Sequence, residues 1–248
     1  MPDDISLDRV IAEAWPPRFE ETIDGWARRL TDGVTRRANS ALVSGRPANI
    51  DAAIDGVESF YRDAQRPTVF LVSEQVSPPE VVSHLIARGY EPTSPTWVLT
   101  RLGVPHEGGG RWVTVAAPDF DEEWLTAYRD GGGLAAETAT LREVLLRPAH
   151  PAVFVTVRSD DGAVAAVGQV VVVDGHGCVQ CLVTVPAARR RGAGRVVVEQ
   201  LMAEAGALGA KSMLAAVMVD NSASLGLFEQ LGFERSHRYS YYRANSVQ

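Results

Sequence analysis

The stretch from Val183 to Arg195 constrains this 248-residue chain more than any other part of its sequence. A β-branched strand ends before Pro186, an arginine-rich turn with two glycines follows, and a helix is predicted over Val196–Ala205. Such a turn leaves free backbone N–H groups at a helix N-terminus, where the helix dipole favours an anion. Because several arginines crowd the same turn, we predict that it binds a phosphate or pyrophosphate group.

The order strand, proline, Arg-x-x-Gly-x-Gly, helix resembles the pyrophosphate-binding motif of the GNAT superfamily of acetyl-CoA-dependent N-acyltransferases. The matching residues are Arg189, Gly192 and Gly194. The resemblance implies that acetyl-CoA is the cosubstrate and that the strand before the motif lies beside its thioester and pantetheine arm. The coenzyme-binding residues implied here are Val183, Thr184, Val185, Arg189, Arg190, Arg191, Gly192, Ala193, Gly194 and Arg195.

A second block supports this resemblance. A strand predicted over Met213–Val219 precedes Asn221 and a helix that ends in Leu-Gly-Phe at 231–233. The corresponding signature of the superfamily is strand, Asn-x-x-Ala-x-x-Leu-Tyr, then Leu-Gly-Phe, and here Ser224 replaces the alanine while Phe228 replaces the tyrosine. The resemblance implies that Asn221 and Phe228 lie beside the coenzyme. Phe228 cannot protonate the departing thiolate as the tyrosine does. Because thiols have a pKa of about 8.5, thiolate is a tolerable leaving group without an acid.

The groups that transfer protons are less well defined by the sequence. An attacking amine must be neutral, so a general base is expected. We take Glu137 as the first candidate because the resemblance places its segment beside the acceptor site, with a solvated helix acid as the alternative. Tyr239, Tyr241 or Tyr242 on the last strand are candidates for the missing acid, and the alternative is that they pack or line the acceptor pocket.

The chain is predicted to divide at a breaker-rich linker, Leu102–Gly110. We expect residues 111–248 to form a catalytic domain with the α/β mixed sheet of the GNAT acyl-CoA N-acyltransferase fold. Residues 1–105 resemble a partial copy of that plan, because His84–Glu91 mirrors 228–234. We therefore predict a degenerate GNAT-like domain in tandem with an intact one, and a coincidence between two αβ units is the alternative. The predicted strands are 39–43, 69–73, 97–101, 111–116, 154–158, 164–173 and 178–185, and the helices are 50–61, 121–129 and 135–146.

The first half lacks the chemistry that binds phosphate. Its equivalent turn, Ser44–Asp51, has one glycine, one arginine and an acid at the start of the following helix. An acid at that place caps the helix and repels a phosphate group. We therefore expect one coenzyme per chain and a structural or substrate-shaping role for this half.

Composition excludes several classes of protein. The net charge of −7 argues against a general nucleic-acid binder. Arg28-Arg29 and Arg36-Arg37 are expected to be solvated faces, and contact with an acidic partner or with the coenzyme's adenosine phosphate is the alternative. No apolar run approaches the ~20 residues that cross a bilayer, and Met1–Ile5 does not resemble a secretory signal. Cys178 and Cys181 lie in one strand, which favours packing over a metal or redox site. A cytoplasmic protein with no metal and no membrane or nucleic-acid partner is expected, as a monomer or homodimer.

These features predict an acetyl-CoA-dependent N-acetyltransferase that moves the acetyl group to a primary amine by direct attack on the thioester. The amine belongs to a small molecule or to a protein, and the sequence does not distinguish these acceptors. Because Phe228 lacks a hydroxyl, a catalytically silent acyl-CoA-binding sensor or regulatory module is the alternative.

Overall fold

The computed structural model describes residues 6–31, 33, 35–103, 112–133 and 138–244. The strands are β1 Phe19–Ile23, β2 Trp26–Leu30, β3 Ala41–Val43, β4 Val69–Ser73, β5 Tyr90–Leu102, β6 Val113–Ala117, β7 Ala152–Arg158, β8 Val164–Val173, β9 His176–Thr184, β10 Ser212–Met218 and β11 Glu234–Ala244. The helices are α1 Leu7–Ala14, α2 Ile50–Asp63, α3 Glu80–Ala87, α4 Glu122–Asp130, α5 Thr138–Leu146, α6 Ala193–Ala207 and α7 Ser222–Gln230. A 3₁₀ turn spans Pro186–Ala188.

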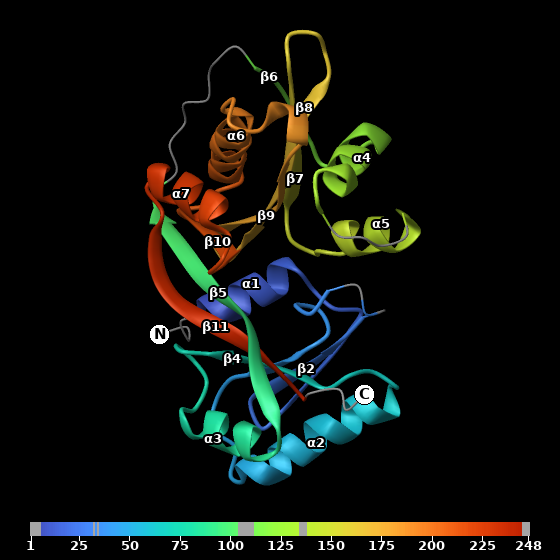
Figure 1. Ribbon diagram of the computed structural model, residues 1–248, viewed down its shortest axis with the longest axis vertical. Coiled ribbons are helices and arrows are strands. Elements are labelled where there is room, and N and C mark those ends of the chain that lie inside the picture. Colours follow the sequence, from blue (N-terminus) through green and yellow to red (C-terminus); the bar gives the residue numbers. More distant parts are fainter. Residues whose placement is uncertain (1–5, 32, 34, 104–111, 134–137, 245–248) are drawn as a thin grey trace.

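The strands of the described residues form one mixed sheet in the order β1-β2-β3-β4-β11-β5-β10-β9-β8-β7-β6 (Figure 1). The first and second halves of the chain exchange strands within it. β5, from the first half, lies between β10 and β11 of the second half, and β11 lies between β4 and β5 of the first. The predicted linker falls mostly on residues 104–111, outside the described residues, so the division into two domains stays a prediction. The sheet itself is continuous from one half to the other.

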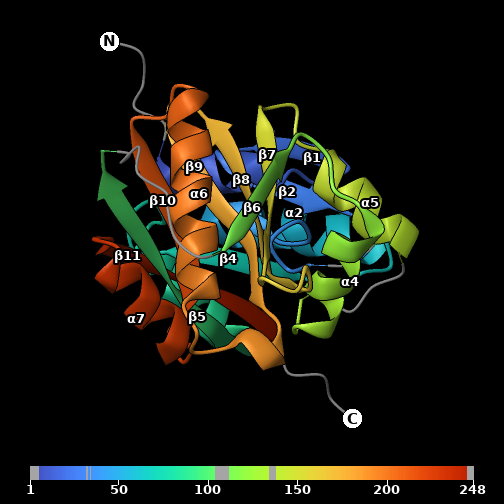
Figure 2. The same cartoon turned by 90° about the horizontal axis from the view of Figure 1, so that it is seen from above.

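Helices cover both faces of this sheet. α6 and α7 pack on one face of the second half, and α4 and α5 pack on the opposite face (Figure 2). α2 and α3 pack on the first half through a shared apolar cluster. α1 belongs to the first half in sequence but contacts β8 and β9 of the second, so it ties the two halves together.

The local patterns explain most of these elements. The β-branched run of β8 is buried along nearly its whole length, as expected for a strand covered on both faces. Asp174 and Gly175 join β8 to β9 with φ values of 47° and 77°, which fits the left-handed residues of a tight hairpin turn. Asn49 caps α2 by accepting from the Ala52 N–H at 3.0 Å, and the helix buries Ile54 and Val57 on one face. The strands predicted at 69–73 and 164–173 are confirmed with the same bounds.

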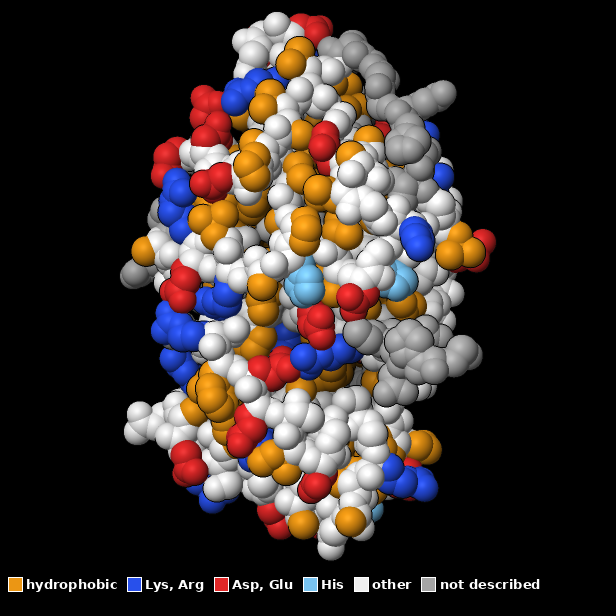
Figure 3. All heavy atoms as spheres, turned by 180° about the vertical axis from the view of Figure 1, so that it is seen from behind, with side chains coloured by type: hydrophobic (Ala, Val, Ile, Leu, Met, Phe, Trp, Pro, Cys, Tyr) orange, Lys and Arg blue, Asp and Glu red, His pale blue; other side chains and the backbone are white. Residues whose placement is uncertain are grey.

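One face of the molecule is mixed in charge. Acidic and basic side chains are interspersed over the face seen in Figure 3. Within the described part of the chain, no helix is both long and apolar enough to cross a membrane.

Candidate functional site

The central sheet opens between two neighbouring strands. β9 and β10 pair in parallel from His176 opposite Ser212 to Val179 opposite Ala215, and the pairing stops there although both strands continue. On the other side of β9, two residues, Cys181 and Leu182, stand opposite a single residue of β8. Cys181 has a φ of 52°, so β9 carries a β-bulge at this point. The bulge and the end of the pairing together create an opening in the sheet.

The arginine-rich turn follows directly after β9. Gly192 has a φ of 90°, a backbone conformation that favours glycine, and it begins α6 without a capping side chain. The Arg195 N–H donates to the Gly192 carbonyl at 3.1 Å. Within the described residues, the N–H groups of Ala193 and Gly194 have no hydrogen-bond acceptor. These two groups at the positive end of α6 are therefore available to an anion.

The four arginines of the turn have different surroundings. The Arg189 guanidinium donates to the Thr184 carbonyl at 3.3 Å and to the Gly131 carbonyl at 3.1 Å, so it braces the turn against the end of β9 and α4. Arg195 forms an ion pair with Glu199 at 2.7 Å. Arg190 and Arg191 are exposed and form no ion pair with any described residue. Among the described residues, Arg190 and Arg191 are therefore the arginines of the turn whose guanidinium groups are available to bind an anion.

The second sequence block lies at the end of β10. The Asn221 side chain caps α7 by accepting from the Ser224 N–H at 3.1 Å. The Phe228 ring is 3% exposed and packs edge-on against Phe233, with ring centroids 4.9 Å apart. Contacts of Asn221 and Phe228 with a coenzyme stay predictions. Glu137, the predicted base, lies outside the described residues.

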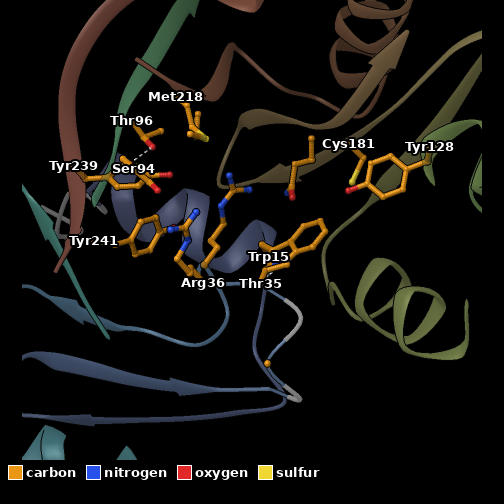
Figure 4. A pocket seen from close by; sticks show the side chains of 14 residues that line it. Trp15, Thr35, Arg36, Ser94, Thr96, Tyr128, Cys181, Met218, Tyr239 and Tyr241 are labelled. Carbon is orange, nitrogen blue, oxygen red and sulfur yellow. Dashed lines mark hydrogen bonds between the residues drawn. The ribbon is translucent and has the colours of Figure 1, made fainter. Parts of the chain in front are cut away.

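A pocket of about 470 Å³ adjoins the opening between β9 and β10 (Figure 4). Its walls come from both halves of the chain, since α1, β5 and β11 meet α4, β9 and β10 there. The lining residues are Trp15, Gly33, Thr35, Arg36, Arg37, Ser94, Thr96, Tyr128, Gln180, Cys181, Ala216, Met218, Tyr239 and Tyr241. None of the lining residues, all of which are described, is Asp, Glu or His. The pocket is therefore aromatic and positively charged.

Two of the three predicted tyrosine candidates face this pocket. Tyr239 and Tyr241 contact each other edge-on with ring centroids 5.6 Å apart. Burial raises the pKa of Tyr241 well above its usual value, so its hydroxyl stays protonated. Tyr242 points to the other face of the sheet and packs with the α2–α3 cluster, so it is a core residue.

Cys181 lines the same pocket, whereas Cys178 is buried in the core under α1. Burial raises the pKa of each thiol to about 12, and a hydrogen bond with Tyr128 lowers that of Cys181 only in part. Both thiols are therefore protonated near neutral pH and are poor nucleophiles. This agrees with the packing role predicted for the pair.

The sequence-based prediction of a solvated face was wrong for Arg29, which is fully buried. It was also wrong for Arg37. Its side chain is half-buried rather than part of a solvated face, and its guanidinium lies over the Trp15 ring, 6.0 Å from the ring centroid. Burial alone lowers the pKa of Arg37, but interactions with Tyr239 and Tyr241, including a hydrogen bond to Tyr239, leave the pKa raised. Two adjacent arginines in a sequence do not indicate a pocket, so the place of Arg37 in the pocket wall is visible only in the folded structure.

This fold is that of the GCN5-related N-acetyltransferases, as predicted. Such a protein from Kribbella flavida superposes with a TM-score of 0.72 at 18% sequence identity, over 96% of this chain and 92% of that one. A model of the family described as "Probable histone acetyltransferase Rv0428c C-terminal" matches residues 4–242, and the chain belongs to this family.

Two curated relatives match nearly the whole chain. The uncharacterized N-acetyltransferase YobR of Bacillus subtilis is 27% identical over 244 residues, covering 96% of this chain and 98% of that protein. The mycothiol acetyltransferase of Rhodococcus erythropolis is 28% identical over 239 residues, covering 90% of this chain and 74% of that protein. Family and relatives together support an acetyltransferase function.

Proposed function

We propose that this protein transfers the acetyl group of acetyl-CoA to a primary amine. The observation that supports the proposal is the opening between β9 and β10. The arginine-rich turn comes directly after β9 in the chain, and the aromatic pocket adjoins the opening. A coenzyme bound with its pyrophosphate at the turn would place its thioester at this opening, next to an amine in the pocket. The tandem arrangement with a degenerate first half is part of the same proposal, supported by the strand exchange between the halves.

The turn fits a pyrophosphate. The free N–H groups of Ala193 and Gly194 supply donors at the positive end of α6, and Arg190 and Arg191 supply charge. A Cβ on residue 194 would lie 2.8 Å from Thr184 Oγ1, so only glycine lets the helix start this close to β9. Thr184, Val183 and Val185 would then border the pantetheine arm.

The bulge in β9 fits the thioester carbonyl. A bulge leaves backbone groups of the longer strand outside the regular pairing, here at Cys181 and Leu182. A backbone N–H aimed into the opening would stabilise the negative charge that develops on the carbonyl oxygen. The amine nitrogen attacks the carbonyl carbon, the new C–N bond forms, the C–S bond breaks, and CoA leaves as thiolate.

The described pocket provides hydroxyl groups but no carboxylate or imidazole for the proton transfers. The proton lost by the amine would therefore pass to water or to Glu137, which stays our candidate base. Tyr239 is the candidate to protonate the thiolate, because it lines the pocket whereas Phe228 has no hydroxyl.

Release of free CoA thiol tests this proposal. The full-length protein is mixed with acetyl-CoA and a panel of primary amines, and a thiol reagent reports CoA. We expect amine-dependent release together with an N-acetylated product seen by mass spectrometry. Tight acetyl-CoA binding without release for any amine would contradict acetyl transfer and favour a silent acyl-CoA sensor.

A further inference from the structure

Among the described residues, two arginines converge on the pocket without a negative partner. Arg36 is exposed and lies over the Tyr241 ring, 5.4 Å from its centroid, while Arg37 lies over Trp15. Within the described residues, neither forms an ion pair, and Arg37 Nε is buried without a hydrogen-bond partner. An unpartnered buried N–H is costly, so a ligand that accepts from it would be favoured.

This contrasts with the rest of the chain. Acidic residues outnumber basic ones, 31 to 24, and many arginines form ion pairs with carboxylates. Arg18 binds Glu143 at 2.6 Å, and Arg238 binds Glu74 at 2.7 Å. In a chain with excess acid, two adjacent arginines at a pocket that form no ion pair with a described residue provide a local positive field for an anion.

The pocket also offers a neutral acceptor. Gln180 Nε2 donates to the Ala14 carbonyl at 2.8 Å, which fixes the amide and leaves Oε1 as the free atom. That oxygen is buried and has no hydrogen-bond donor within the described residues. Gln180 lies on β9 directly before the bulge at Cys181, so an amine that donates to Oε1 would be held beside the opening.

From these groups we propose that the acceptor is a small primary amine that also carries an acid group, a carboxylate or a phosphate. Arg36 and Arg37 bind the acid group, Gln180 Oε1 accepts from the amine, and the aromatic walls hold the part between them. This rests on the proposed acetyl transfer, since it names the acceptor class of that same pocket. A lysine-rich peptide is disfavoured because the described walls offer it two positive charges and no carboxylate.

Pairs of amines that differ only in the acid group test how much that group contributes to recognition of the acceptor. Phenylalanine is compared with phenethylamine, and phosphoethanolamine with ethanolamine, which also distinguishes carboxylate from phosphate. CoA release gives kcat/KM for each amine, and thermal unfolding of the protein with each amine reports binding without turnover. We expect at least a tenfold preference for the acid member of one pair, about 1.4 kcal/mol. We also expect a rise in Tm with that acid alone.

Substitutions test which residues carry the preference. In the Arg36→Gln/Arg37→Gln double variant the acid-to-neutral ratio should fall close to one, with acetyl-CoA affinity unchanged. Arg62→Gln removes the same charge from an exposed position on α2, away from the pocket, and should leave the ratio as in the wild type. A ratio that persists in the double variant would overturn the assignment to these arginines.

The two proposals fail in different ways. If acids raise the Tm through Arg36 and Arg37 but no amine releases CoA, the acid site stands and acetyl transfer fails. If CoA is released equally from both members of each pair, or best with a lysine-rich peptide, acetyl transfer stands and the acid-bearing acceptor is wrong. If no acid raises the Tm of the wild type and none is preferred, the acid-bearing acceptor is also wrong.

Discussion

Gly194 lies so close to Thr184 that a Cβ on residue 194 would stand 2.8 Å from Thr184 Oγ1. This contact joins the start of α6 to the end of β9, the two elements that border the proposed pyrophosphate and pantetheine sites. A side chain at 194 would push these elements apart. The glycine therefore has a packing role in addition to leaving its N–H accessible.

The first prediction concerns this glycine. Gly194→Asp adds a side chain against Thr184 and a negative charge at the helix N-terminus, so acetyl-CoA affinity should fall more than tenfold, about 1.4 kcal/mol or more. Gly194→Ala adds the contact without the charge and should give a smaller loss. Gly226→Ala is the matched control, because a Cβ there meets nothing within 4 Å. Calorimetry that shows unchanged affinity for a folded Gly194→Asp variant would refute the assignment.

The second prediction separates the arginines of the turn. Arg190→Gln and Arg191→Gln should each weaken acetyl-CoA binding by at least roughly tenfold, because hydrogen bonds to charged groups are worth about 1.5–3 kcal/mol. Arg195→Gln should have less effect because Glu199 already pairs with that charge. Arg189→Gln should lower the Tm, since its guanidinium braces Thr184 and Gly131. Titrations of each variant with acetyl-CoA at two salt concentrations check these differences in affinity. Equal losses of affinity in the Arg190→Gln and Arg195→Gln variants would contradict the prediction.

The third prediction tests two roles of Asn221. Because Asn221 caps α7, Asn221→Ala should lower the free energy of unfolding by about 1 kcal/mol. Asn221→Ser should retain most of the capping interaction. If Asn221 also borders the coenzyme, Asn221→Ser should raise the KM for acetyl-CoA with little change in Tm. Changes confined to stability across both variants would restrict Asn221 to capping.

The structure shows which parts of this architecture carry a local signal. The apolar runs of β4 and β8 and the turn after β9 are recognisable because their pattern lies within a few residues. β1 is largely exposed and lacks the alternation of a half-buried strand, and neither it nor β2 was predicted. α1 has only eight residues and was also missed. Its apolar face is explained only by the folded structure, in which it packs against β8 and β9.

The pocket had no such signal. Trp15, Arg37, Gln180 and Tyr241 are far apart in the chain and meet only because α1 spans the halves and β11 is exchanged between them. Pairing between strands so distant in the chain produces no periodic pattern in the sequence from which it could be predicted. The proposed coenzyme side of the site is therefore carried by a compact motif in the sequence, whereas the proposed acceptor side depends on long-range topology.

The fourth prediction concerns Phe228. If CoA leaves as thiolate without help from this position, Phe228→Tyr should keep kcat near the wild-type value or raise it modestly. Phe233→Tyr is the matched control, because it places a hydroxyl in the same apolar cluster on the neighbouring ring. A buried hydroxyl without a partner costs about 1–3 kcal/mol, so we expect the control to lower Tm. A large fall in kcat for a folded Phe228→Tyr variant would show that the ring has a further role.

The fifth prediction is that each chain binds one acetyl-CoA. The turn before α2 is closed to phosphate because Asn49 already occupies the Ala52 N–H, whereas α6 has no capping side chain. The acid at the start of α2 is also paired, because Asp51 contacts His84 and Arg88 at 3.1 Å. These contacts lower the pKa of Asp51, so it stays negative.

Calorimetric titration of the full chain should therefore give a stoichiometry near one. Arg46→Gln, which removes the arginine of the first-half turn, should leave acetyl-CoA affinity unchanged because Arg46 is paired with Glu80. The Arg190→Gln/Arg191→Gln variant should lose the single binding event. A stoichiometry near two, or binding that survives in that variant and disappears in Arg46→Gln, would place a working coenzyme site in the first half. The strand exchange would then join two active acyltransferase units.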